Sequence, residues 1–221
     1  MISRTHCFVL AGLILAAVAV SGVFTPLLPE RVPVHYNLSG EADRYGSRWE
    51  LLIVFPALIA VVAVVMVALP LLGPFRRNFE RFQTTYGRVC IAMLSALVAM
   101  QVVAFLKAQG VALQLGATLA IVFGLTLAVI GNWLGKVRRN FYLGIRTPWT
   151  LANDLVWERT HRFGARLFTA HGLVAAACGF FAPDPVCFVV LIGGLVAVAL
   201  ICTLYSIYCY HKHRKVDELA A

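Results

Sequence analysis

Six long stretches of this chain are almost free of charge, and that pattern limits the fold more than any other feature. A hydrocarbon core of about 30 Å needs about 20 apolar residues in a helix that rises 1.5 Å per residue. Runs of that length lie at approximately residues 7–27, 50–74, 86–106, 110–134, 164–182 and 186–210. We therefore expect an all-α polytopic membrane protein, with six transmembrane helices in a single membrane domain over residues 1–221.

Composition excludes an ordinary water-soluble fold. Of the 221 residues, 61% are hydrophobic and 13% are charged, whereas soluble domains are about half apolar and a quarter charged. The long runs are apolar on every side, unlike the helices of a soluble bundle, which keep one polar face. The first run follows Arg4 in the manner of a signal peptide, but it reaches full spanning length, so we expect a retained helix.

Lysine and arginine are distributed very unevenly between alternate connections. If the N-terminus lies in the cytoplasm, 15 of these residues fall on the inner side and four on the outer side. Cytoplasmic loops retain positive charge, so we predict that both termini face the cytoplasm of a bacterial cytoplasmic (inner) membrane. Basic inner loops facing anionic lipid explain the formal charge of +9. The lipid bilayer is the expected partner, and no direct nucleic-acid binding is expected.

The second run carries several local signals. Ser47 and Glu50 have the spacing of a capping box at a helix start, and Trp49 lies where an interfacial aromatic residue belongs. Pro56 and Pro70 predict a kink or ordinary bending within this helix.

The six cysteines are scattered without any C-x-x-C pair. We expect them to behave as small buried hydrophobic residues. Cys178 and Cys187 flank a short turn, which leaves a disulfide between them open.

A polar outer segment at residues 33–48 is a candidate ligand-binding loop. Its candidate residues are His35, Asn37, Gly40, Glu41, Asp43, Arg44 and Tyr45. Three interpretations are open: a neutral cap in which Arg31, Arg44 and Arg48 pair with the carboxylates, a surface for a peptide or partner, or a divalent metal site at His35, Glu41 and Asp43. The spacing fits no standard metal motif, and no cofactor is expected.

A polar inner segment at residues 140–161 is the second candidate. Gly144 is expected to end a helix and Thr147-Pro148 to start one. We predict an interfacial helix before the fifth span, with Trp149 and Trp157 at the membrane boundary. An inert anchor, a docking surface for a cytoplasmic partner and an active site are all open interpretations.

Few polar residues lie within the apolar runs: Gln101, Gln114, Asn132 and His171. Such groups usually face neighbouring helices and bond them, and His171 is the strongest functional candidate because ionisable groups are costly at that depth. The sequence has no G-x-S-x-G, H-E-x-x-H, Walker or G-x-G-x-x-G motif. We therefore assign no catalytic residue.

The two polar segments resemble known families. Residues 33–48, PVHYNLSGEADRYGSR, resemble a small membrane domain of unknown function, and residues 131–161, GNWLGKVRRNFYLGIRTPWTLANDLVWERTH, resemble the hallmark of the SdpI family of bacterial multi-pass immunity proteins. The matched inner positions are Asn140, Gly144, Ile145, Arg146, Thr147, Pro148, Trp149, Thr150, Leu151, Asn153, Trp157, Thr160 and His161.

This resemblance implies a six-span protein that protects its cell from a secreted peptide toxin and captures a cytoplasmic transcriptional repressor. The corresponding hypothesis is coupling: a ligand contacts residues 35–45 outside, helices shift, and residues 146–161 change their exposure inside. A membrane-embedded metal-dependent enzyme, a small-solute transporter and a purely structural or lipid-interacting protein are the rival hypotheses.

Overall fold

Six membrane-spanning helices form the protein, as the apolar runs predict. The computed structural model describes residues 2–37, 40–73 and 76–219. Within this part, six helical segments are long and apolar enough to cross a membrane. The helices are α1 (Arg4–Phe24), a 3-10 turn (Thr25–Leu27), α2 (Arg48–Leu72), α3 (Arg76–Ala108), α4 (Leu115–Leu134), α5 (Pro148–Ala152), α6 (Asp154–Phe181), α7 (Asp184–Phe188), a π-helical segment (Val189–Gly193) and α8 (Gly194–Leu219). The all-α multi-pass prediction is confirmed.

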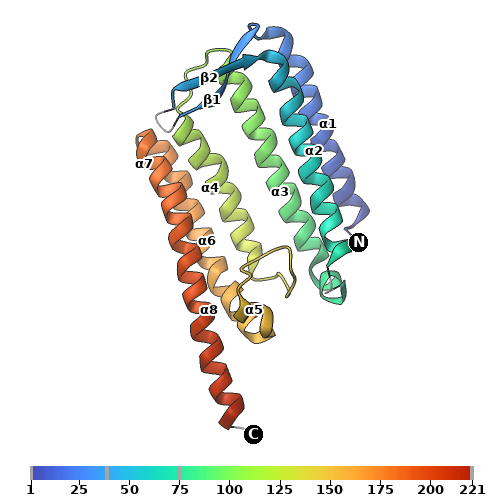
Figure 1. Ribbon diagram of the computed structural model, residues 1–221, viewed down its shortest axis with the longest axis vertical. Helices are drawn as coiled ribbons and strands as arrows, with labels where there is room; N and C mark the ends of the chain where they lie inside the picture. The colour runs from blue at the N-terminus through green and yellow to red at the C-terminus, as the bar shows by residue number, and fades with distance from the viewer. Residues whose placement is uncertain (1, 38–39, 74–75, 220–221) are drawn as a thin grey trace.

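The helices pack as two sets joined along one seam. The first set is α1, α2 and α3, each in contact with the other two, and the second set is α4, α6, α7 and α8. Helices α3 and α4 meet at the seam (Figure 1). Both chain ends lie toward the end of the bundle that carries α5, which we call the inner end from the charge distribution (Figure 1).

Glycine permits the closest helix pair, α4 against α6. A methyl group at Gly124 would lie 2.6 Å from the backbone nitrogen of Ala176, and one at Gly172 would lie 2.4 Å from the backbone nitrogen of Ala128. Membrane helices gain van der Waals contact when small residues let their backbones approach. The second set is therefore built around this tight pair.

Helix α2 remains a helix through both of its prolines. Pro70 has no N–H and leaves the carbonyl four residues earlier, that of Met66, without its helical partner. The Tyr86 hydroxyl of α3 donates a hydrogen bond of 2.7 Å to this carbonyl. A neighbouring helix thus supplies the missing donor, as membrane proline sites require. The predicted capping box of Ser47 and Glu50 is also confirmed.

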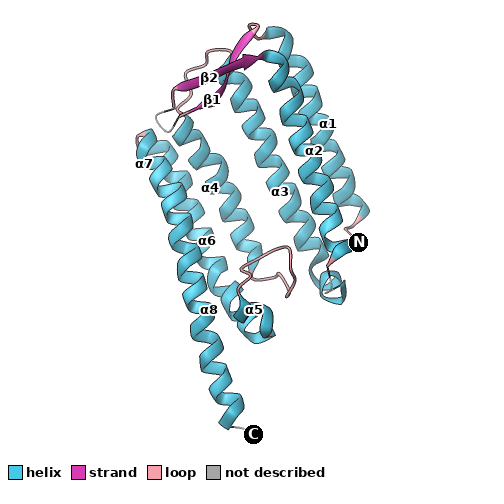
Figure 2. Ribbon diagram, in the orientation of Figure 1, coloured by secondary structure: helices cyan, strands magenta, loops and turns pink. Residues whose placement is uncertain are grey.

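An antiparallel hairpin covers the outer end of the first set. Its strands are β1 (Arg31–Tyr36) and β2 (Ala42–Ser47), with Arg31 opposite Ser47 and Tyr36 opposite Ala42. Figure 2 shows these strands across one end of the helical bundle. Val32 is fully buried and packs with Leu28, Leu51, Phe105 and Ala108. The sequence predicted a polar loop at residues 33–48, whereas the structure forms a hairpin there.

The inner polar segment is organised differently from the prediction. Residues 154–163, expected to form part of a surface helix, are the first turns of the spanning helix α6, and only the five-residue α5 precedes them. Trp157 is buried rather than interfacial, because its ring packs inside the protein. Gly144 ends no helix; it lies in a loop at φ +117°.

The polar residues of the spans divide into two groups. The Gln101 amide donates to the Ala17 carbonyl at 2.8 Å and to the Ser21 hydroxyl at 2.9 Å, which confirms that it bonds a neighbouring helix. His171 likewise bonds the Leu191 carbonyl at 3.2 Å. The prediction was wrong for the other two: Gln114 precedes α4 as its exposed N-cap, and Asn132 is exposed near the inner end of α4.

The cysteines are free thiols. Cys187 and Cys178 form no disulfide, and the Cys187 thiol donates to the Cys178 backbone carbonyl at 3.4 Å. Cys7 differs from the prediction of burial, since it is exposed on α1.

Candidate functional site

The hairpin tip is shaped by two of the predicted outer residues. The Asn37 backbone accepts a hydrogen bond from Gly40 at 3.0 Å, and its side-chain oxygen accepts one from the Glu41 backbone at 3.0 Å. Gly40 adopts φ +78°, a left-handed conformation that suits glycine. Asn37 and Gly40 therefore build the tip rather than offering free side chains for binding.

The charged residues of the hairpin pair differently from the expected cap. His35 Nδ1 and Asp43 Oδ1 lie 2.6 Å apart, and both side chains are largely exposed. The Arg48 guanidinium donates to the Leu28 carbonyl at 3.1 Å. In the described ranges, the Asp43 carboxylate contacts His35, and none of Arg31, Arg44 and Arg48 lies within 4.0 Å of a carboxylate, so the arginine-neutralised cap was wrong.

The three outer metal-ligand candidates do not assemble. Among the described residues, no group of three His, Cys, Asp or Glu side chains is placed to hold a metal ion. His35 and Asp43 meet across the strands, whereas Glu41 is exposed at the tip and does not complete a site with them. The geometry therefore gives no support to the metal interpretation.

The hairpin tip reaches the second helix set. A methyl group on Gly40 would lie 3.4 Å from Oδ2 of Asp184, at the start of α7. The other oxygen of Asp184 accepts a hydrogen bond of 2.9 Å from the Ala117 backbone in the first turn of α4. Sequence reasoning missed Asp184, although its acidic character beside a helix start was a usable signal. A loop that joins α1 to α2 thus rests on α4 and α7.

A second outer contact also lies near the seam. The Lys107 ammonium lies 4.7 Å from the centre of the Tyr36 ring and donates to the Leu113 carbonyl at 3.0 Å. Burial raises the pKa of the Tyr36 phenol above its ordinary value. Strand β1 is therefore tied to the connection between α3 and α4.

A cavity of about 430 Å³ opens at the base of the hairpin. It is lined by Glu30, Arg31, Tyr45, Gly46, Ser47, Arg48 and Trp49. Tyr45 was a predicted ligand-binding residue, while Arg44 is exposed on β2 outside this cavity. Exposed aromatic rings beside two arginines suit contact with a peptide rather than a metal.

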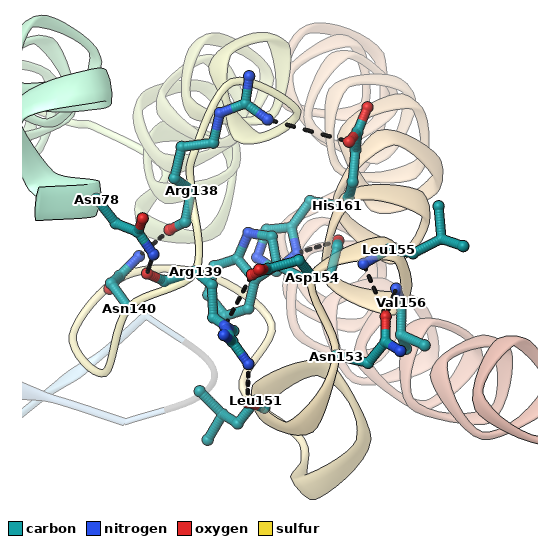
Figure 3. A network of polar contacts seen from close by, with 12 residues as sticks. Asn78, Arg138, Arg139, Asn140, Leu151, Asn153, Asp154, Leu155, Val156 and His161 are labelled. Atoms are coloured by element: carbon teal, nitrogen blue, oxygen red, sulfur yellow. Dashed lines mark hydrogen bonds and ion pairs between the residues drawn. The ribbon is translucent and has the colours of Figure 1, made fainter. Parts of the chain in front are cut away.

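At the inner end, Asn140 holds the loop between α4 and α6 in shape. Its amide nitrogen donates to the carbonyls of Arg138 and Leu143, at 2.7 and 3.0 Å, and its oxygen accepts from the backbones of Tyr142 and Leu143, at 2.8 and 2.7 Å. Asn140 is fully buried. All the bonding capacity of this side chain is therefore used inside the loop, as part of the network in Figure 3.

His161 joins this loop to α6. Its Nδ1 donates to the Trp157 carbonyl at 2.8 Å, and its Nε2 accepts from the Ile145 backbone at 3.0 Å, which fixes a neutral tautomer. The ring stacks on Trp157 with centroids 3.9 Å apart. Gly144 must remain without a side chain, because a Cβ there would lie 2.3 Å from His161 Nε2.

Threonines fix the following turn. Thr147 caps α5 as predicted, with Pro148 in the first turn, and its backbone donates to the Thr150 hydroxyl at 2.9 Å. The Thr147 hydroxyl lies 3.0 Å from that of Ser206 on α8. Asn153 then caps α6 through its side-chain oxygen. These threonines and Asn153 connect the loop to α8 and α6.

The inner loop rests on the first helix set. Tyr142 packs among Phe79, Phe82 and Tyr86 of α3, with ring centroids 5.3 to 6.3 Å apart. Asn78 of α3 donates to the Arg139 carbonyl at 3.0 Å. Burial raises the pKa of the Tyr142 phenol, which stays neutral. Sequence reasoning missed this aromatic cluster, whose signal was the helical spacing of the three α3 rings.

Ion pairs cover the loop on its solvent side. Arg139 Nε lies 2.8 Å from Asp154 Oδ1, and Glu158 pairs with Arg162 at 2.7 Å. A polar cavity of about 290 Å³ lies beside these pairs, between α3, the loop and α6. Arg138, at 4.0 Å from Glu158, borders the same cavity.

The predicted inner residues therefore fall into two classes. The buried ones form the scaffold: Asn140, Thr147, Trp157, Thr160 and His161. Arg146 and Pro148 are exposed, Trp149 is half-buried, and the neighbouring Phe141 adds an exposed ring. The scaffold thus presents a small basic and apolar surface at the inner end.

Comparison with known proteins matches both segments. Residues 136–206 match the SdpI/YfhL protein family, and residues 12–60 match a domain of unknown function, DUF1648. The first region contains the inner scaffold, and the second contains the hairpin. Each predicted resemblance is confirmed.

Two relatives are similar to parts of this chain. The immunity protein SdpI of Bacillus subtilis (strain 168) is 24% identical over 188 residues, which cover 84% of this chain and 86% of that protein. An uncharacterized protein of Archaeoglobus fulgidus is 37% identical over 68 residues, covering 28% of this chain and 37% of the relative. No solved structure matches the chain.

Proposed function

We propose that this chain is a membrane immunity protein that protects its cell from a secreted peptide toxin, because residues 136–206 match the SdpI/YfhL protein family. The similarity to an immunity protein over 86% of that protein's length supports this role. We further propose that the toxin binds at the hairpin and that a cytoplasmic repressor is captured at the inner loop.

One observation carries the proposed coupling: each loop belongs to one helix set and rests on the other. The hairpin joins α1 to α2, and its tip at Gly40 lies against Asp184 of the second set. The inner loop joins α4 to α6, and its Tyr142 packs on α3 of the first set. A movement of one set against the other must therefore disturb both loops.

This arrangement suggests how an outer ligand acts at the inner surface. A toxin that binds the base of the hairpin, beside Tyr45 and Trp49, favours a position of the tip away from Asp184. The first set then shifts along the seam and alters the packing of Tyr142 and the exposure of Arg146. A ligand shifts such an equilibrium only by its difference in affinity for the two arrangements.

Immunity is tested by expression in Bacillus subtilis lacking its own SdpI. Survival is measured under the toxin against which SdpI protects. We expect the wild-type chain to restore survival, and His161→Leu to abolish it because the scaffold loses the acceptor for the Ile145 N–H. Arg166→Gln is the matched control, since Arg166 is exposed on the same helix.

The membrane abundance of each variant is measured by immunoblotting, so that loss of protein is distinguished from loss of protection. Absence of protection by an abundant wild-type chain would contradict the immunity proposal. Protection that survives His161→Leu at equal abundance would leave immunity standing and remove the inner scaffold from the mechanism.

Coupling has its own readout, hydrogen exchange of residues 138–147 in the reconstituted protein. We expect addition of the same toxin to accelerate exchange there and at the hairpin tip. Acceleration confined to the hairpin would refute transmission between the loops.

A further inference from the structure

A groove of about 510 Å³ follows the seam between α3 and α4, where the two helix sets meet. Its α3 wall includes the short side chains of Ala92, Ser95 and Ala99, which share one helix face. Val122 and Leu125 form part of the α4 wall. Because the α3 side chains are short, they leave the space between the helices unfilled and open to the surroundings.

The groove has the length of one membrane leaflet. Arg88 and Ala99 mark its extent on α3 and are eleven residues apart, which corresponds to about 16 Å at 1.5 Å per residue. Half of a hydrocarbon core of about 30 Å is about 15 Å. An acyl chain from the inner leaflet therefore fits along the groove.

The inner end of the groove carries a positive charge. The Arg88 guanidinium is exposed and lies 5.9 Å from the centre of the Trp133 ring. In the part of the chain that the structure describes, no carboxylate lies within 4.0 Å of Arg88. Arg81 lies two turns earlier on α3, while Glu158 across the adjoining cavity is already paired with an arginine.

We propose that this groove binds one anionic phospholipid of the inner leaflet, with an acyl chain between α3 and α4 and its phosphate at Arg88. Guanidinium groups form strong charge-assisted hydrogen bonds with phosphate oxygens. Trp133 lies at the level expected for an interfacial aromatic ring. The positive end and apolar walls together match the two parts of such a lipid, and the inference does not depend on immunity.

Native mass spectrometry of the full chain tests the site directly. The purified protein is titrated with dioleoylphosphatidylglycerol and, separately, with dioleoylphosphatidylcholine. We expect one phosphatidylglycerol molecule to bind more tightly than phosphatidylcholine. Arg88→Gln should weaken phosphatidylglycerol binding about fivefold, because one basic group near an anionic surface contributes about 1 kcal/mol. It should weaken phosphatidylcholine binding less, because the choline cation offsets the charge of that lipid's phosphate.

Arg166→Gln is the matched charge control. Arg166 is exposed on α6 between Arg162 and Thr169, which lie beside Gly135 and Gly131 of α4. It is therefore at the depth of Trp133 but outside the groove, and its replacement should leave lipid binding unchanged. Equal affinity for the two lipids, or equal effects of the two arginine substitutions, would overturn the proposal.

Filling the groove provides a second test. Ser95→Phe should abolish the binding of both lipids, because the new ring occupies the chain position, whereas Ala197→Phe on the exposed surface of α8 should not. Bound lipid that persists in Ser95→Phe would overturn the site. A dimer that dissociates in this variant would also overturn it, by identifying a second copy of the chain as the occupant.

A spectroscopic measurement uses the tryptophan at the inner end of the groove. Phosphatidylglycerol with brominated acyl chains is added to the wild-type protein and to Trp133→Phe, and the quenching of tryptophan fluorescence is compared. We expect stronger quenching in the wild type, because Trp133 borders the bound lipid. Equal fractional quenching in the two proteins would contradict the proposal.

Discussion

Replacing Gly144 with alanine should destabilise the protein through two separable effects. At φ +117° any side chain is strained, which costs about 1–3 kcal/mol. The added methyl group would also lie 2.3 Å from His161 Nε2. It would force the imidazole away from the Ile145 N–H, which donates a hydrogen bond to Nε2. A buried donor left without its partner costs about 1–3 kcal/mol more, so we expect a total of about 2–6 kcal/mol.

Gly110→Ala isolates the backbone effect from the collision. Gly110 also has positive φ, at +87°, but no atom lies within 4 Å of the position of its Cβ. The assay is reversible unfolding in mixed micelles, followed by far-ultraviolet circular dichroism as dodecyl sulfate increases. We expect Gly144→Ala to lower the free energy of unfolding by about 1–3 kcal/mol more than Gly110→Ala does.

A double-mutant cycle identifies the collision partner. In a His161→Ala background the imidazole is absent, so the cost of Gly144→Ala should fall to that of Gly110→Ala. Gly12→Ala, in open space on α1, should be neutral or stabilising because alanine favours helix. Equal costs for Gly144→Ala and Gly110→Ala in the wild-type background would refute the claim that His161 holds the loop.

Three further predictions test other parts of the structure. Tyr86→Phe should cost about 0.6–1.7 kcal/mol in the same unfolding assay, and a Pro70→Ala background should remove most of that cost by restoring a helical donor; an undiminished cost would contradict the assigned bond. Asp184→Ala should increase hydrogen exchange at the hairpin tip and in the first turn of α4, and unchanged exchange at both would contradict the contact. In a background lacking Cys7, Arg44→Cys should react with a membrane-impermeant maleimide in intact cells, whereas Arg146→Cys should react only after permeabilisation. The reason is that the two loops are predicted on opposite sides of the membrane. Equal labelling of the two variants would overturn the predicted orientation.

The spanning helices were predictable because their cause is local. A run such as residues 50–74 is apolar on every side, and no soluble packing could bury it. The capping box at Ser47 and the cap at Thr147 were also predictable, because each depends on side chains within one turn of the helix start. The prediction was wrong where an apolar run extends beyond the helix that it forms. The run at residues 110–134 includes Gln114, but α4 begins one residue later, at Leu115.

The contacts made by the inner segment, residues 140–161, could not be predicted in the same way. Trp157 has the composition of an interfacial anchor, yet its indole donates to the Val137 carbonyl at 2.8 Å inside the protein. Likewise, Asp43 was expected to bind a metal together with His35 or to pair with an arginine, but it contacts His35 across two strands. These contacts join residues from different elements, and spacing along one chain does not specify which elements meet.

The sequence by itself determined that the chain lies in a membrane, how many times it crosses, and which segments resemble known families. Those properties follow from the free energy of moving each segment from water to hydrocarbon, to which every residue contributes nearly independently. Only the tertiary structure decided that the hairpin and the inner loop each rest on the opposite helix set, with a groove between them. Such contacts depend on the packing of side chains from distant segments, such as Tyr142 on α3 and Gly40 beside Asp184.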